Sequence, residues 1–426
     1  MAASLLFTQA HAQTDNNRTL STRVADILAQ VPANNAAKLN KNMDEIAQIG
    51  KPGIVQLASM LTPLGKGDNS KIEYALGGFT YAASASGKES WRKMAAEAYV
   101  EALSKVADPD NKMFLIYQLQ TVGKDESVPA LKSYLGDDRL VGPAARALAR
   151  IGSPAAGAAL LQSLEGASTA KQIAIAEALG NLKYKESTSA IEKLATSSDD
   201  KLRKVALYSL SEIGAPSSAA IMLAAASKAS YGYDVTDASG VYVKYLASLG
   251  KTNAPIAETA ALALMKSTQS PSQLATRSAA LKVYSDLKKR ESVPVLVSAM
   301  SSNDAEYREA ALKLGEKYTM ANGTAPWLAA LKKAKPAVQA EIITMLGRSG
   351  SNDGLAAVTK ALSAKDSKVK LAAIGAVAKI GKEASVTSLL PILKKGTSEE
   401  VAAVKSSLLT LPGTGILDQI ATVLPS

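Results

Sequence analysis

Residues 185–214 read KESTSAIEKLATSSDDKLRKVALYSLSEIG, and this stretch decides the fold. Its first half places Ile191, Leu194 and Ala195 on one face, and a polar turn over residues 196–200 follows. The second half carries apolar residues at the i, i+3, i+4 and i+8 spacing of an amphipathic helix: Leu202, Val205, Ala206, Leu210 and Ile213. The pattern predicts two short helices joined by a turn, and neither helix can bury its apolar stripe without a neighbouring copy.

The ends of the second segment carry residues that begin and end helices. Asp199 or Asp200 can accept hydrogen bonds from the free N–H groups of the first turn. Gly214 can adopt the left-handed conformation that closes a helix. The same signals recur along the chain, with helix starts at Asp137, Ser168, Asp199, Asp304, Asp366 and Ser398 and helix ends at Gly152, Gly214, Gly250, Gly350, Gly381 and Gly413.

These signals define a repeat of about 31 residues over residues 126–413. Residues 36–125 predict longer, divergent helical repeats, the first of which ends at Gly50-Lys51-Pro52. Residues 414–426 resemble the first helix of a further, incomplete repeat, so we expect the chain to be a piece of a longer protein, or its last helix to act as a cap. Apolar residues make up 47% of the chain but aromatic residues only 4%, which favours closely packed, Ala-rich helices.

The repeat resembles the HEAT repeat family, including its bacterial short-unit relatives. The matching residues are Asp199, Arg203, Val205, Ala206, Leu210 and Ile213-Gly214, and again Asp366, Lys370, Ala372, Ala373 and Ile380-Gly381. The resemblance covers about residues 40–413 and implies an all-α fold, a right-handed α-solenoid (superhelix) of about ten HEAT-like helical hairpins. It implies that second helices line the concave face. It also implies a ladder of acidic and basic motif residues between repeats, with Arg203, Arg308 and Lys370 at the basic position.

The N-terminus predicts export. Residues 1–10 are apolar, and Ala10-His11-Ala12 has the small residues of a signal-peptide cleavage site, which would leave Gln13 as the mature N-terminus. No basic segment precedes the apolar one, and an ordinary N-terminus is the alternative interpretation. We therefore expect a truncated signal peptide over residues 1–12, a polar segment over residues 13–35, and a periplasmic or secreted protein. No later apolar run reaches the ~18 residues of a membrane span.

Catalytic chemistry has few candidates in this sequence. There is no Cys, and His11, the only His, lies inside the presumed signal, so the mature chain would exclude a His base, Cys–His catalysis and His/Cys zinc sites. Adjacent acids at residues 137–138, 199–200 and 399–400 lie in repeat turns, where helix capping explains them. We predict no catalytic residue, no metal site and no cofactor, and therefore no enzyme.

The clearest irregularity is the repeat containing residues 230–250, which is longer than the others and rich in tyrosine. Tyr supplies a broad contact area and a hydroxyl, which suits a partner-binding surface. A longer loop that packs its own aromatic residues is the equally open alternative. The candidate partner-binding residues are Tyr231, Tyr233, Asp234, Asp237, Tyr242 and Tyr245.

Two further irregularities are weaker candidates. Tyr74, Tyr81 and Trp91 lie close in sequence to Gly77-Gly78, which indicates either core packing or a ligand site. Lysines in the later turns would align into a basic ridge that could meet phosphate or an acidic glycan, or would simply solvate helix ends: Lys332, Lys333, Lys335, Lys365, Lys368, Lys370, Lys394 and Lys395. The net charge of +11 is spread along the chain and favours general solubility.

Three functional hypotheses follow. The first is a non-catalytic scaffold of the cell envelope that binds a protein or peptide on its concave face. The second is an accessory module of a larger secreted carbohydrate-processing enzyme, whose catalytic domain would lie beyond residue 426. The third is a HEAT-like nucleic-acid-binding protein or DNA glycosylase, which would need a basic concave surface around Trp91 or Trp327; we expect nucleic acid to be the least favoured partner.

Overall fold

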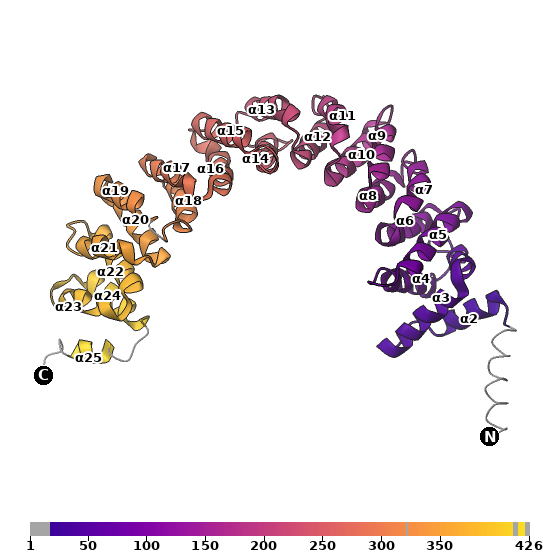
Figure 1. The fold of residues 1–426 in the computed structure, drawn as a ribbon, viewed down its shortest axis with the longest axis horizontal. Coiled ribbons are helices and arrows are strands. Elements are labelled where there is room, and N and C mark those ends of the chain that lie inside the picture. The colour runs from indigo at the N-terminus through magenta and orange to yellow at the C-terminus, as the bar shows by residue number, and fades with distance from the viewer. Residues whose placement is uncertain (1–17, 321–322, 412–415, 422–426) are drawn as a thin grey trace, which may run out of the picture. The chain divides into compact units, whose positions relative to one another are not determined.

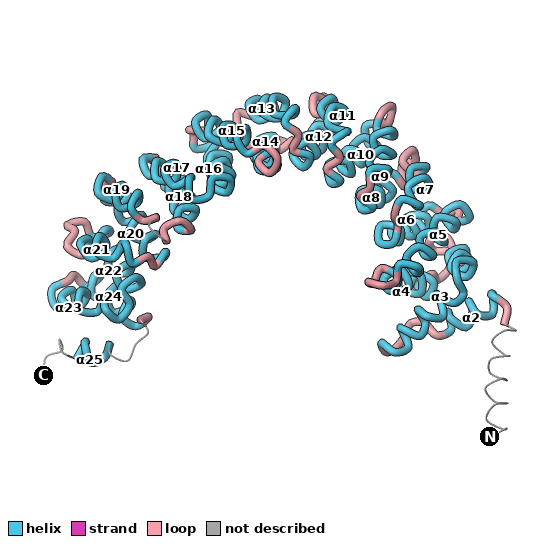
Figure 2. Tube along the Cα trace, viewed as in Figure 1, coloured by secondary structure: helices cyan, strands magenta, loops and turns pink. Residues whose placement is uncertain are grey.

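A computed structural model describes residues 18–320, 323–411 and 416–421, and within these ranges the chain forms helices and turns without a strand (Figures 1 and 2). The chain divides into two compact units. Unit 1 comprises residues 1–222 and 235–237, and unit 2 comprises residues 223–234 and 238–426. The predicted signal peptide, residues 1–12, lies outside the described residues.

The helices of unit 1 are α2 (Leu20–Ala29), α3 (Ala36–Ser59), α4 (Ser70–Ala83), α5 (Glu89–Lys105), α6 (Pro109–Val122), α7 (Val128–Ser133), α8 (Val141–Ile151), α9 (Pro154–Leu164), α10 (Thr169–Leu182), α11 (Thr188–Leu194) and α12 (Asp200–Ile213). Helix α13 (Ala219–Lys228) crosses the boundary between the units. The helices of unit 2 are α14 (Ala238–Leu249), α15 (Ala254–Ser267), α16 (Leu274–Lys288), α17 (Val293–Ser298), α18 (Ala305–Glu316), α19 (Ala325–Lys333), α20 (Pro336–Ser349), α21 (Leu355–Ala361), α22 (Ser367–Gly381), α23 (Val386–Lys395), α24 (Ser398–Leu409) and α25 (Ile416–Ala421).

Each unit has two layers of helices. Second helices pack on second helices, from α6 through α8 and α10 to α12 in unit 1 and from α14 through the even-numbered helices to α24 in unit 2. First helices form the other layer, in which α25 packs on α23. Stacking of this kind buries each apolar stripe between neighbouring copies, which confirms the predicted α-solenoid.

The stretch that decides the fold has the predicted structure. Asp199 caps α12 by accepting a hydrogen bond from the Leu202 amide at 2.8 Å, and Gly214 closes the helix with a φ of 64°. In the apolar stripe, Ile191, Ala206 and Leu210 are fully buried. One part was not predicted, because α11 is preceded by a 3-10 turn, η2 (Lys185–Ser187), whose Ser187 is also fully buried.

Several predicted helix ends need correction. Gly250 and Gly381 do not have positive φ; close packing explains them instead, because a Cβ would lie 2.5 Å from Leu287 and 2.8 Å from Ser385, respectively. The left-handed residue after α22 is Lys382, with a φ of 48°. Helix α24 is capped by Thr397 rather than by Ser398, and Gly413 lies outside the described residues. The predicted break at Gly50 is present as a kink with a φ of 67° inside α3.

The acidic and basic motif residues also differ from the expected ladder. Asp199, Asp304 and Asp366 accept hydrogen bonds from backbone amides as helix caps, so they are not the partners of the basic residues. Arg308 instead pairs with Glu341 in the next second helix, and Lys370 pairs with Glu400 in the same way. The Lys370 ammonium is the largest cause that holds the pKa of Glu400 below its usual range.

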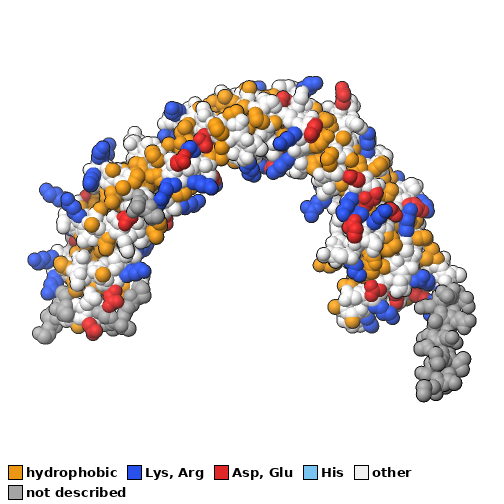
Figure 3. Space-filling model, viewed as in Figure 1, with side chains coloured by type: hydrophobic (Ala, Val, Ile, Leu, Met, Phe, Trp, Pro, Cys, Tyr) orange, Lys and Arg blue, Asp and Glu red, His pale blue; other side chains and the backbone are white. Residues whose placement is uncertain are grey.

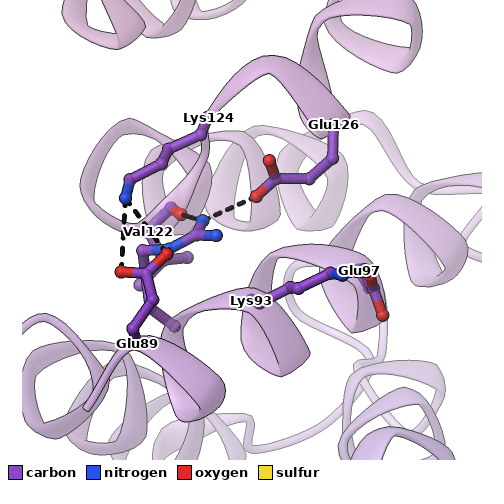
Figure 4. Close-up of polar contacts among 7 residues, drawn as sticks. Glu89, Lys93, Glu97, Val122, Lys124 and Glu126 are labelled. Carbon is purple, nitrogen blue, oxygen red and sulfur yellow. Dashed lines mark hydrogen bonds and ion pairs between the residues drawn. The ribbon is translucent and has the colours of Figure 1, made fainter. Parts of the chain in front are cut away.

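Unit 1 joins its repeats by a comparable network. The buried Arg92 donates to the Val122 carbonyl and to Glu126, both at 2.6 Å, and to Glu89 at 2.8 Å (Figure 4). Lys124 also reaches Glu89, and these two cations hold the pKa of Glu89 below its usual range, Lys124 making the larger contribution. The basic residue again links its own helix to the following repeat.

Candidate partner-binding cleft

A cleft of about 800 Å³ opens in unit 2 between two consecutive repeats. It lies where the ends of the first helices α15 and α17 meet the starts of the second helices α16 and α18. The intra-repeat turns at residues 268–273 and 299–304 bound it. Its apolar wall consists of Leu262, Met265, Val295, Ala299 and Tyr307.

Arg277 is the distinctive polar residue of this cleft. Its guanidinium carbon lies 3.8 Å from the centre of the Tyr307 ring, a cation–π contact. Its Nε is buried without a hydrogen-bond partner, and Arg277 forms no ion pair with any residue in the described ranges. Burial is the main cause that raises the pKa of Tyr307, and the nearby Arg277 charge opposes that rise.

Two further charges border the cleft. Lys266 is exposed at the end of α15, and Asp304 lies on the opposite side. The Asp304 carboxylate is fixed as the cap of α18, because it accepts a hydrogen bond from the Tyr307 amide at 3.1 Å. The cleft therefore combines an apolar wall with two cations and a single helix-capping acid.

The tyrosine-rich turn forms a loop that is hydrogen-bonded to the start of α16. Ser230 and Tyr231 have φ angles of 52° and 55°, which cost free energy for residues with side chains. Gln273 and Thr276 of the α16 start hold this backbone by donating to the Ser230 and Tyr231 carbonyls, each at 2.8 Å. The loop presents Tyr233 to solvent with 92% of its surface exposed.

The loop and the cleft share one element. In the short segment from Pro271 to Arg277, Gln273 and Thr276 hold the loop, whereas Pro271 and Arg277 line the cleft. Residues 230–234 and the cleft therefore both adjoin the start of α16. We define these two features together as the α16 site.

The structure divides the predicted tyrosine cluster. Tyr233 and Asp237 are exposed, and Tyr231 and Asp234 are partly buried. The prediction that Tyr242 and Tyr245 contribute to a binding surface is wrong, because α14 turns both side chains into the core, where they are 4% and 0% exposed. Their rings stack there with a centroid distance of 6.4 Å. Burial raises the pKa of Tyr242 to about 12.

The aromatic residues near the N-terminus mainly pack the core of unit 1. Phe79 is fully buried and stacks on the half-buried Trp91 at 5.6 Å, and the Lys88 ammonium lies 3.6 Å from the centre of a Trp91 ring. The partly buried Tyr74 accepts a hydrogen bond from the Ala33 amide at 3.3 Å, which ties it to the preceding turn. Tyr81 alone among the three candidates here is exposed, at 81%.

The later lysines are exposed in three consecutive turns of unit 2, except Lys370, which pairs with Glu400. The face drawn in Figure 3 nevertheless carries acidic and basic side chains together. Trp327 is fully buried against Gly315, so its ring cannot stack on a base. The described residues contain no cluster of potential metal ligands, and no helix among them is long and apolar enough to cross a membrane.

Two family models match the chain. The model for HEAT repeats matches residues 157–240 and 324–408, and the model for the PBS lyase HEAT-like repeat matches residues 144–166. With the two-layered stacking of helical hairpins, these matches define the class as an α-solenoid repeat protein. The chain carries HEAT repeats over residues 144–240 and 324–408.

Solved structures with similar helical architecture include Kap121p (9% identity, TM-score 0.41), importin beta (13%, 0.44) and the Kap95:Nup1 complex (13%, 0.46). The similarity covers 95%, 94% and 95% of this chain and 56%, 64% and 60% of those chains, respectively. The chain thus spans less than two thirds of each, and the likeness concerns architecture alone. No curated protein matches the chain.

The sequence prediction missed Lys266, Arg277 and Tyr307. A signal for Arg277 was present, because it is the fourth residue of its second helix, as are Arg203, Arg308 and Lys370. The cleft itself had no sequence signal. It depends on how two repeats pack, and each of its lining residues fits the ordinary helical pattern.

Proposed function

We propose that this protein is a non-catalytic HEAT-repeat scaffold of the cell envelope that binds a protein partner through the α16 site. The single observation that carries the proposal is the position of an open, partly apolar cleft beside a rigid loop that exposes Tyr233. Exposed aromatic side chains and apolar pockets are the features that dominate protein recognition. We therefore propose a partner at the intra-repeat turns, whereas the sequence led us to expect it on the layer of second helices.

The backbone of the loop supports a binding role. Two residues with side chains are kept at positive φ, and Gln273 and Thr276 offset that cost with hydrogen bonds. Single residues such as Lys382 follow other helices at positive φ, whereas Ser230 and Tyr231 are two such residues in succession. A pre-organised loop instead reduces the entropy lost when a partner binds.

Selection of peptides from a random phage-displayed library against the full chain tests this proposal. We expect selected peptides to lose at least about tenfold in affinity for Ser301→Trp, because the bulky ring fills the cleft from an exposed position. Ser363→Trp is the matched control, since Ser363 is also exposed and occupies the corresponding turn two repeats later. Equal binding to both variants, or no enriched peptide, would contradict the proposal.

The envelope location rests on residues 10–12, which carry the small residues of a cleavage site. When the gene is expressed in a Gram-negative host with its natural N-terminus, we expect a periplasmic chain whose intact mass corresponds to a start at Gln13. Replacement of Ala12 by a bulky residue should retain the precursor. A cytoplasmic chain that still begins at Met1 would rule out export by this segment.

A further inference from the structure

The basic position of the second helices joins neighbouring repeats in unit 2. Arg308 donates to both oxygens of Glu341, at 2.6 and 2.7 Å, and to the Ser302 carbonyl at 2.8 Å. Lys370 pairs with Glu400 at 2.8 Å. At both places a cation on one second helix binds a carboxylate on the next.

Arg277 occupies this position in α16, but its carboxylate partner is missing. The residue that corresponds to Glu341, at the same spacing of 33 residues, is Ala310. The residue that corresponds to Glu400, at a spacing of 30 residues, is Tyr307, which offers an aromatic ring instead of a carboxylate. The ladder pair that Arg308 and Lys370 each make is therefore missing at Arg277, as it is in α20, where Gln339 occupies the basic position.

The Arg277 guanidinium is only partly satisfied within the described residues, because its contact with Tyr307 leaves Nε without an acceptor. Nε of Arg277 is removed from water and has no acceptor. The guanidinium matches a carboxylate with two parallel hydrogen bonds, as Arg308 does with Glu341. Lys266 adds a second positive charge, and the apolar wall lies beside them.

We propose that Arg277 binds a carboxylate of the partner and so completes the interrupted ladder from outside the chain. The carboxylate belongs to an acidic side chain or to a C-terminus, and an adjacent apolar side chain occupies the wall formed by Leu262, Met265 and Val295. The negative charge of Asp304 opposes a doubly charged phosphate, which favours a carboxylate over a phosphorylated residue. This inference rests on the proposed function, because it specifies what the α16 site recognises.

The probes are peptides selected on the full chain, each compared with its Glu→Gln or Asp→Asn form and with its C-terminally amidated form. We expect one of these changes to weaken binding by about tenfold or more, and which one does so identifies the source of the carboxylate. For Arg277→Gln, the charged and neutral peptides should bind equally. Arg277→Gln removes a cation–π contact but no ion pair within the described residues, so we expect a folded variant whose unfolding temperature falls by only a few degrees.

A second variant supplies the missing acid within the chain. Ala310 lies on α18 at the place that Glu341 occupies on α20, so Ala310→Glu should pair with Arg277. We expect this variant to lose the preference for acidic peptides while neutral forms still bind. If the preference survives both Arg277→Gln and Ala310→Glu, Arg277 is not the carboxylate receptor, although a loss of binding in Ser301→Trp would still support the cleft itself.

Discussion

Gly347→Val is expected to lower the free energy of unfolding of unit 2 by about 3 kcal/mol or more. Gly347 lies in α20 against α22, and a Cβ there would be 2.7 Å from both Cα and Cβ of Ala376. The obstacle is partly backbone, so no rotation of a side chain can relieve it. The two second helices would have to separate, and the core between these repeats would lose its close packing.

Hydrogen exchange of the full chain measures this effect locally, because repeat arrays need not unfold in one step. Amides of α20 and α22 should exchange faster, whereas those of α8 and α10 in unit 1 should not change. Gly375→Ala is the matched control: it lies inside α22 with no atom within 4 Å of its Cβ position, and it should stabilise the helix by up to about 1 kcal/mol. Similar losses in the two variants would show that helix propensity, and not close approach, explains Gly347.

Arg308→Ala should cost about 3 kcal/mol, because it leaves Glu341 and the Ser302 carbonyl without their shared donor. The Arg308 side chain is only 9% exposed and that of Glu341 only 27%, so water replaces these hydrogen bonds poorly. The hydrogen bond that Arg308 donates to Glu341 is the main cause that raises the pKa of Arg308, so the guanidinium stays charged. We expect faster hydrogen exchange in α18 and α20 and a lower unfolding temperature.

Lys313→Ala provides the comparison on the same helix. Lys313 pairs with Glu309 at 3.5 Å, but their side chains are 70% and 43% exposed, and such pairs contribute about 0.5 kcal/mol or less. Adding Glu341→Ala to Arg308→Ala should restore part of the loss, since no unpaired acid then remains. If Arg308→Ala is as mild as Lys313→Ala, the ladder does not hold the repeats together.

The ladder at Arg308 shows which contacts between repeats can be predicted from the sequence and which cannot. Arg308 was predicted as a ladder residue from its place in the motif, and the structure confirms that it joins neighbouring repeats. The predicted acids of the ladder were wrong, because a short Asp at a helix start reaches its own backbone amides, as Asp304 does. The longer side chain of Glu341 reaches back to the preceding helix instead.

The tyrosines of residues 230–250 fall into an exposed group and a buried group, which the sequence could not separate. Tyr233 lies on the loop, so its exposure follows from the length of the turn. Tyr242 and Tyr245 lie on α14, and three residues of separation place both on the face that packs into unit 2. Spacing alone shows that they share a face, but it does not show which face meets the neighbouring repeats.

By itself, the sequence determined the class of fold. Apolar residues with a helical period, acids at helix starts and glycines at Gly152, Gly214 and Gly350 act within a few residues of each other, so they can be recognised without knowing the packing. The tertiary structure decided what that fold offers to a partner. Pairing between repeats joins residues about 30 positions apart, and only that packing reveals that Arg277 contacts a tyrosine at the spacing where Lys370 has a carboxylate.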